Sequence, residues 1–131
     1  MGSNMLSEGK QGLYKNVLTA DNQDYLSLNS LFTQPDNSVI EFDIEVFNTI
    51  SSVICTNGTT DTYMEVNNTN LFFQTNGVNS QELIGQVTLG RHTITVRRGV
   101  SQNFLSIDGG AEELATATAP LSVLELNKIT S

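Results

Sequence analysis

Residues 38–47, with the sequence SVIEFDIEVF, constrain the fold more than any other part of the chain. Apolar and acidic side chains alternate here without a break. The apolar row is Ile40, Phe42, Ile44 and Val46, and the acidic row is Glu41, Asp43 and Glu45. A period of two places the two rows on opposite faces of an extended chain. The stretch therefore predicts a β-strand whose apolar face covers a core.

Residues 92–110 predict a β-hairpin. Polar and apolar residues alternate over 92–97, turn-forming residues fill 99–103, and 104–107 form a second short run. Asp108, Gly109 and Gly110 then supply a strong turn signal, because these residue types tolerate the backbone conformations of tight turns.

The rest of the chain repeats short strand-like runs between turns rich in Asn and Gly. Further strands are predicted at residues 12–19, 25–28, 51–56, 62–66, 71–75, 81–89 and 121–129. Residues 29–37 contain Pro35, Asp36 and Asn37 and predict a long crossover loop. Residues 111–117 allow a short helix, which the strand-rich surroundings disfavour. The pattern as a whole predicts an all-β fold.

Length and charge narrow the classes of protein. We interpret residues 1–11 of the 131 as a flexible N-terminus or a cloning remnant, and residues 12–131 as one domain. The net charge of −8 disfavours a nucleic-acid partner and an anionic membrane surface. Arg91, Arg97 and Arg98 are too few for a phosphate-binding patch, so we expect solvated arginines on a strand. No signal peptide or membrane-inserted segment is visible.

The residues that commonly perform catalysis are sparse. Cys55 is the single cysteine and lies in an apolar run, so we expect a buried and unreactive thiol. His92 is the single histidine, and no spacing typical of a catalytic triad or a zinc site surrounds it.

The predicted hairpin resembles a motif of the concanavalin-like and laminin-G-like jelly rolls, commonly written W-H-x-V-x-V, loop, L-Y-V-D-G. RHTITV at residues 91–96 and LSIDG at 105–109 occupy the corresponding places. Residues 22–28 and 38–47 are similar to two strands that precede this hairpin in the superfamily. The resemblance implies a two-sheet antiparallel β-sandwich of the concanavalin-like jelly-roll type.

A sugar-binding surface is predicted on the central strands. Aromatic rings stack on sugars, and amide side chains pair with hydroxyl groups. The candidate ligand-binding residues are Tyr63, Asn57, Asn68, Asn70, Phe72 and Gln74. Because neighbouring residues of a strand face opposite ways, one of Phe72 and Phe73 must instead point into the core.

The resemblance also implies a metal. Laminin-G-like domains often hold Ca²⁺ at the rim of the sandwich through loop oxygens. The candidate ligands here are Asp21, Asp24, Asp61 and Asp108, with Asn57 as a further loop oxygen. Asp108 equally suits a simple turn before two glycines. Ca²⁺ is the one cofactor that this comparison suggests.

The acidic row at residues 41–45 permits an enzymatic alternative. E-x-D-x-E is similar to the catalytic strand of concanavalin-fold glucanases, in which Glu41 would be the nucleophile, Glu45 the acid/base, and Asp43 the group that tunes both. The chain has no Trp to form sugar platforms, and an exposed strand face needs charge in any case. We therefore favour a solvated face over catalysis.

These features lead to one expected function and two alternatives. We expect a noncatalytic binding or attachment module for a glycan or a cell-surface receptor, similar to modules of phage tail fibres and bacterial surface proteins. It would then be extracellular or carried on a virion. Repeated copies strengthen weak sites, so a homo-oligomer is an open alternative. The competing functions are a self-assembling structural protein and a small glycosidase.

Overall fold

The computed structural model describes residues 25–76 and 78–128. These residues form ten β-strands and no helix, so the all-β prediction is confirmed. It follows that no helix in these ranges could span a membrane. The predicted strand at 12–19 and the candidate metal ligands Asp21 and Asp24 lie outside the described residues.

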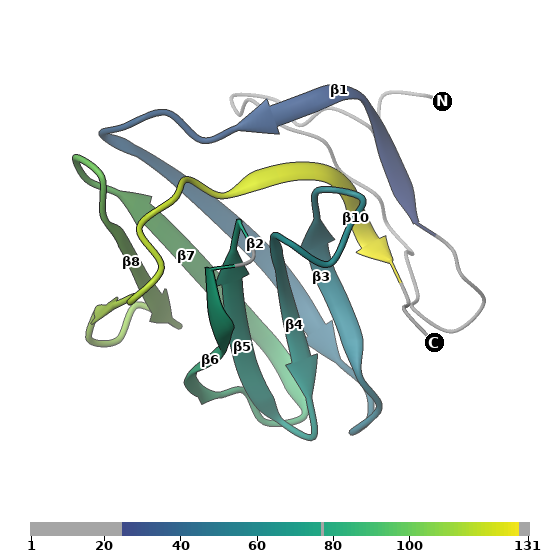
Figure 1. Ribbon diagram of the computed structural model, residues 1–131. Helices are drawn as coiled ribbons and strands as arrows, with labels where there is room; N and C mark the ends of the chain where they lie inside the picture. Colours follow the sequence, from purple (N-terminus) through teal and green to yellow (C-terminus); the bar gives the residue numbers. More distant parts are fainter. Residues whose placement is uncertain (1–24, 77, 129–131) are drawn as a thin grey trace, which may run out of the picture.

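The strands form two antiparallel sheets (Figure 1). The large sheet contains, in spatial order, β1 (Leu26–Thr33), β10 (Ser122–Lys128), β3 (Ser52–Thr56), β4 (Tyr63–Asn67), β5 (Asn70–Thr75) and β6 (Val78–Gln86). The small sheet contains β2 (Ser38–Val46), β7 (Gly90–Arg98), β8 (Asn103–Ile107) and β9 (Glu113–Leu114). Strands β2 and β7 pass behind β4 and β5 in Figure 1, as two layers.

The core lies between the two sheets. Met64, Leu71 and Phe73 of the large sheet and Val96 and Leu105 of the small sheet are fully buried in one apolar cluster. Two apolar faces that cover one another are the defining feature of a β-sandwich, and the predicted sandwich is confirmed. The jelly-roll assignment stays a prediction, because this architecture does not identify a superfamily.

Strand β2 follows its sequence pattern. Its apolar row packs against the core, while Glu41, Asp43 and Glu45 are exposed on the other face. β2 pairs along its full length with β7 and forms an edge of the small sheet. Cys55 is buried as expected, and burial raises the pKa of its thiol to about 12.

The predicted turns also form. Strands β7 and β8 pair as a hairpin, followed by a turn in which Asp108 and Gly109 have φ angles of 54° and 70°. Strands β4 and β5 are joined by Asn68 and Thr69, with φ angles of 49° and 61°. Two successive positive φ angles characterise the type I′ turn that suits the twist of a two-residue hairpin.

Two segments differ from the predictions. Residues 29–33 belong to β1 instead of a loop, because Phe32 and Thr33 resume pairing with β10 after an irregularity between Ser27 and Phe32. Residues 111–117 form no helix. They are extended because β9 pairs with β8, the Ala115 N–H donates to the Asn103 carbonyl, and the side chains of Ala115 and Ala117 are buried.

The prediction of solvated arginines is wrong for Arg98, of which 5% is exposed. Its guanidinium donates to Asp36 Oδ1 (3.1 Å), Asn103 Oδ1 (3.0 Å) and the Thr118 carbonyl (2.6 Å). The neighbouring Arg97 points to the other face of the strand, where it pairs with Glu112. Alternation along β7 thus separates two adjacent arginines into one buried and one surface side chain.

Candidate functional site

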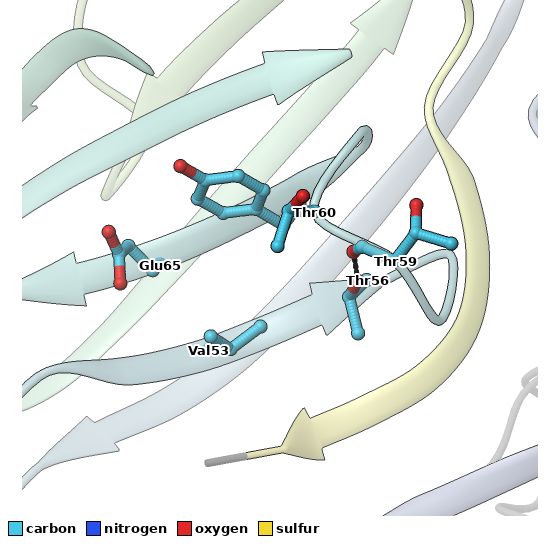
Figure 2. A pocket seen from close by; sticks show the side chains of 6 residues that line it. Val53, Thr56, Thr59, Thr60 and Glu65 are labelled. Carbon is cyan, nitrogen blue, oxygen red and sulfur yellow. Dashed lines mark hydrogen bonds between the residues drawn. The ribbon is translucent and has the colours of Figure 1, made fainter. Parts of the chain in front are cut away.

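A cavity of about 140 Å³ opens on the outer face of the large sheet, between β3 and β4. Its lining residues are Val53, Thr56, Thr59, Thr60, Tyr63 and Glu65. Tyr63 and Glu65 alternate with the core residues Met64 and Val66, and therefore face away from the core. Figure 2 shows Val53, Thr56 and Glu65 on the two strands, with Thr59 and Thr60 in the loop at one end.

A β-bulge in β3 builds the floor of the cavity. Val53 lies opposite Glu65 and Thr56 opposite Tyr63, with an irregularity between Val53 and Cys55. In a regular strand, residues three apart face opposite sides. The bulge inserts an extra residue, so that Val53 and Thr56 both face outward while Cys55 stays buried opposite Met64.

The loop at residues 57–62 is held by its own hydrogen bonds. The Thr56 hydroxyl donates to the Thr59 carbonyl (2.7 Å), drawn as a dashed line in Figure 2. Asn57 Oδ1 accepts from the Thr59 N–H (3.0 Å) and hydroxyl (2.8 Å). Gln74 Nε2 donates to the Thr60 carbonyl (2.9 Å), which ties the loop to β5. The hydroxyls of Thr56 and Thr59 are therefore positioned before any ligand arrives, and Thr60 is held through its carbonyl.

Glu65 is a buried carboxylate, with 9% of the residue exposed. It accepts hydrogen bonds from the Ser51 hydroxyl (2.6 Å) and from Gln81 Nε2. Both donors are neutral, and among residues 25–76 and 78–128 no cationic side chain forms an ion pair with Glu65. An ionised carboxylate offers about four acceptor sites, so Glu65 can accept further hydrogen bonds from a ligand.

Tyr63 supplies a partly buried aromatic ring beside this carboxylate. Burial and the negative charge of Glu65 both raise the pKa of the Tyr63 hydroxyl. The hydroxyl therefore stays protonated around neutral pH and can donate a hydrogen bond. A ring with a polar end, next to fixed acceptors, suits a ligand that has both an apolar face and hydroxyl groups.

The candidate sugar-binding residues separate into two groups. Tyr63 lines the cavity, Gln74 lies opposite it on β5, Asn57 holds the loop, and Phe72 lies opposite Glu65 on the same outer face. Phe73 is the phenylalanine that fills the core. Asn68 and Asn70 lie at the other end of the β4–β5 hairpin, at and beside its turn.

Sequence reasoning missed Glu65, its two donors, and the threonines of the cavity. One signal was available, because Tyr63 and Glu65 alternate with Met64 and Val66 and so had to share the outer face. The burial of that face had no local signal. It depends on Ser51 and Gln81, which come from other segments.

The acidic row of β2 lies away from this cavity, on the small sheet. Glu41, Asp43 and Glu45 are exposed, and they lie opposite Thr95, Thr93 and Arg91 of β7. Asp43 accepts a hydrogen bond from the Thr93 hydroxyl (3.0 Å). A second cavity, of about 90 Å³, is lined by residues around Ile84, Leu105 and Ile107 and includes none of the three. This placement favours a solvated face.

The candidate metal ligands that the structure describes lie apart. Asp61 is exposed in the loop beside the cavity, on the large sheet. Asp108 is at the turn after β8, on the small sheet, where it accepts from His92 Nδ1 (2.6 Å) and from the Thr93 N–H (2.8 Å). Within residues 25–76 and 78–128, no group of three or more His, Cys, Asp or Glu side chains is arranged to hold a metal ion. Calcium binding stays a prediction.

Comparison with known proteins assigns no family. No protein-family model, no curated protein and no solved structure matches this chain. The fold and the site together define an antiparallel β-sandwich that presents a small cavity, lined by both polar and apolar groups, on one outer face.

Proposed function

We propose that this protein is a noncatalytic carbohydrate-binding module whose site is the cavity between β3 and β4. The observation that carries the proposal is the lining of that cavity. It combines the Tyr63 ring, three threonines held near the mouth and the buried Glu65 carboxylate. Sugars present an apolar ring face together with hydroxyl groups, and such a lining complements both.

The size of the cavity indicates how a glycan would bind. Pockets that enclose small ligands measure roughly 300–1,000 Å³, whereas this one measures about 140 Å³. The cavity would hold one terminal residue of a glycan, and the rest would extend across the outer face past Phe72 and Gln74. A contact of this size is weak, so the module would gain strength from several copies.

The proposal extends to the setting of the module. Glycans and receptors on cell surfaces are its natural partners, which would make the protein extracellular or part of a virion. Its support is the concanavalin-like motif, whose two halves lie on β7 and at the end of β8 and so form one hairpin. Membership of that superfamily is part of the proposal.

A glycan array tests the proposal with three proteins. We expect the wild type to bind a defined set of glycans, and Tyr63→Ala to weaken that binding roughly tenfold, because stacking and one hydrogen bond are lost. Phe47→Ala removes an aromatic ring that is exposed outside the cavity, and should change nothing. Repeating the array with Ca²⁺ and then with a chelator tests the calcium prediction. Absence of binding to any glycan contradicts the proposed function.

A further inference from the structure

We infer that the cavity selects sugars with a free amino group, meaning unacetylated hexosamines, and that Glu65 is the residue that selects them. The inference rests on the proposed function and adds the class of sugar. It begins from the charge of Glu65. This carboxylate is buried between two neutral donors, while the ion pairs of the described residues involve Asp36, Asp108 and Glu112.

A second carboxylate lies near the cavity. Glu125 of β10 lies opposite Thr56, on the other side of β3 from β4, and 7% of it is exposed. Its Oε1 lies 3.5 Å from where a side chain on Gly58 would begin, which places it beside the loop of the cavity. The protein also carries a net charge of −8. Sialic acids, uronic acids and sulfated sugars would be repelled, and cations attracted.

The cavity residues match an ammonium group. An ammonium is a compact charge with three donors, and the cavity offers the Glu65 carboxylate and threonine oxygens as acceptors. The Tyr63 ring adds a face that attracts cations. Hydrogen bonds between an ammonium and a carboxylate are about twice as strong as those between neutral groups. N-acetylation would remove the charge and add bulk that a cavity of about 140 Å³ does not favour.

The test compares three trisaccharides with the same β-1,4 linkage, namely the trimers of glucosamine, of N-acetylglucosamine and of glucose. Calorimetric titration is done at a pH at which the amines are protonated. We expect the wild type to bind the glucosamine trimer about tenfold more tightly than the other two. Glu65→Gln keeps the shape of the side chain and should abolish that preference.

Two controls distinguish recognition in the cavity from general attraction of cations by the net charge of the protein. Glu41→Gln makes the same change in net charge on the exposed face of β2, and should keep the preference. Tetralysine carries ammonium groups without a sugar, and should not displace the glucosamine trimer. The inference is wrong if Glu41→Gln loses the preference as Glu65→Gln does, or if tetralysine competes as well as the sugar.

A measurement on the wild type covers the case in which Glu65→Gln does not fold. In NMR spectra the side-chain amide of Gln81, which donates to Glu65, should shift at about tenfold lower concentrations of the glucosamine trimer than of the glucose trimer. Equal affinity for all three sugars overturns the inference and leaves the proposed function standing. Absence of binding to every sugar on the array overturns both the inference and the proposed function.

Discussion

His92 is held between two acceptors, and this arrangement favours its charged form. Its Nδ1 lies 2.6 Å from Asp108 Oδ2 and its Nε2 lies 2.7 Å from the Thr88 carbonyl oxygen. A carboxylate and a carbonyl oxygen can only accept, so these two contacts favour the form of the ring in which both nitrogens carry a proton. The hydrogen bond to Asp108 is the main cause of a raised His92 pKa, and the Thr88 carbonyl adds to it. The same bond lowers the pKa of Asp108, with help from the Thr93 N–H.

Stability should therefore depend on pH through this pair. Because the folded-state pKa of His92 lies above the ordinary value of 6.5, its contribution is fully present below 6.5 and is lost as pH rises through the folded-state value. Because the pKa of Asp108 lies below 3.8, its contribution is lost as pH falls through that lower value. We expect His92→Gln to lower the free energy of unfolding more at about pH 5.5 than at about pH 9. Urea denaturation of the wild type and the variant at each pH measures the two losses, and equal losses contradict the prediction.

The end of β7 depends on a buried polar cluster. Arg98 joins the β1–β2 turn at Asp36, the start of β8 at Asn103, and the Thr118 carbonyl. Asn103 donates in turn to the carbonyls of Ala117 and Ala119, both at 2.8 Å. These bonds hold residues 115–119, which have no strand partner of their own beyond Ala115.

Two adjacent substitutions test this cluster. Arg98→Met should lower the free energy of unfolding by about 2–3 kcal/mol, because it leaves the buried Asn103 Oδ1 without its donor and removes the bonds to Asp36 and Thr118. Arg97→Met removes a surface pair with Glu112 and a contact with the Phe104 ring, and should cost clearly less than Arg98→Met, because solvent screens an exposed ion pair. Chemical denaturation of both variants gives the comparison. Similar losses of stability in the two variants would contradict a greater contribution of Arg98 to the fold.

At the scale of the whole molecule, β1 and β2 are edge strands among the residues that the structure describes, and charge protects the edge at β2. β1 and β2 form neighbouring edges of the two sheets, joined by the turn at residues 34–37. Leu31, Phe32 and Val39 are exposed there, 52%, 43% and 57% respectively. Exposed edges invite pairing with another chain, and charged side chains discourage it. The acidic row of β2 thus has a structural explanation that requires no catalysis.

Neutralising that row tests the explanation. We expect the triple variant Glu41→Gln, Asp43→Asn and Glu45→Gln to self-associate more than the wild type, because like charges no longer repel a second β2 edge. Light scattering at matched concentrations measures the change. An unchanged mass, together with the loss of a measurable glycan hydrolysis, would instead support the glycosidase alternative.

The local pattern of the chain was sufficient for much of this fold. Alternation predicted β2 and the strands of the β7–β8 and β4–β5 hairpins. Turn residues predicted where the chain reverses direction between the strands. These features depend on neighbours in sequence, because the period of two assigns each side chain to a face. The same rule required one of Phe72 and Phe73 to be in the core, and the packing chose Phe73.

Tertiary contacts decided what covers each face. Strand pairing with β10 extended β1 through residues predicted as a loop, and acceptors from three segments buried Arg98. The candidate site arises in the same way, since a bulge in β3 aligns Val53 with Thr56, and Ser51 and Gln81 enclose Glu65. Periodicity specifies which way a side chain points, but its burial, charge and partners depend on strands that are distant in sequence.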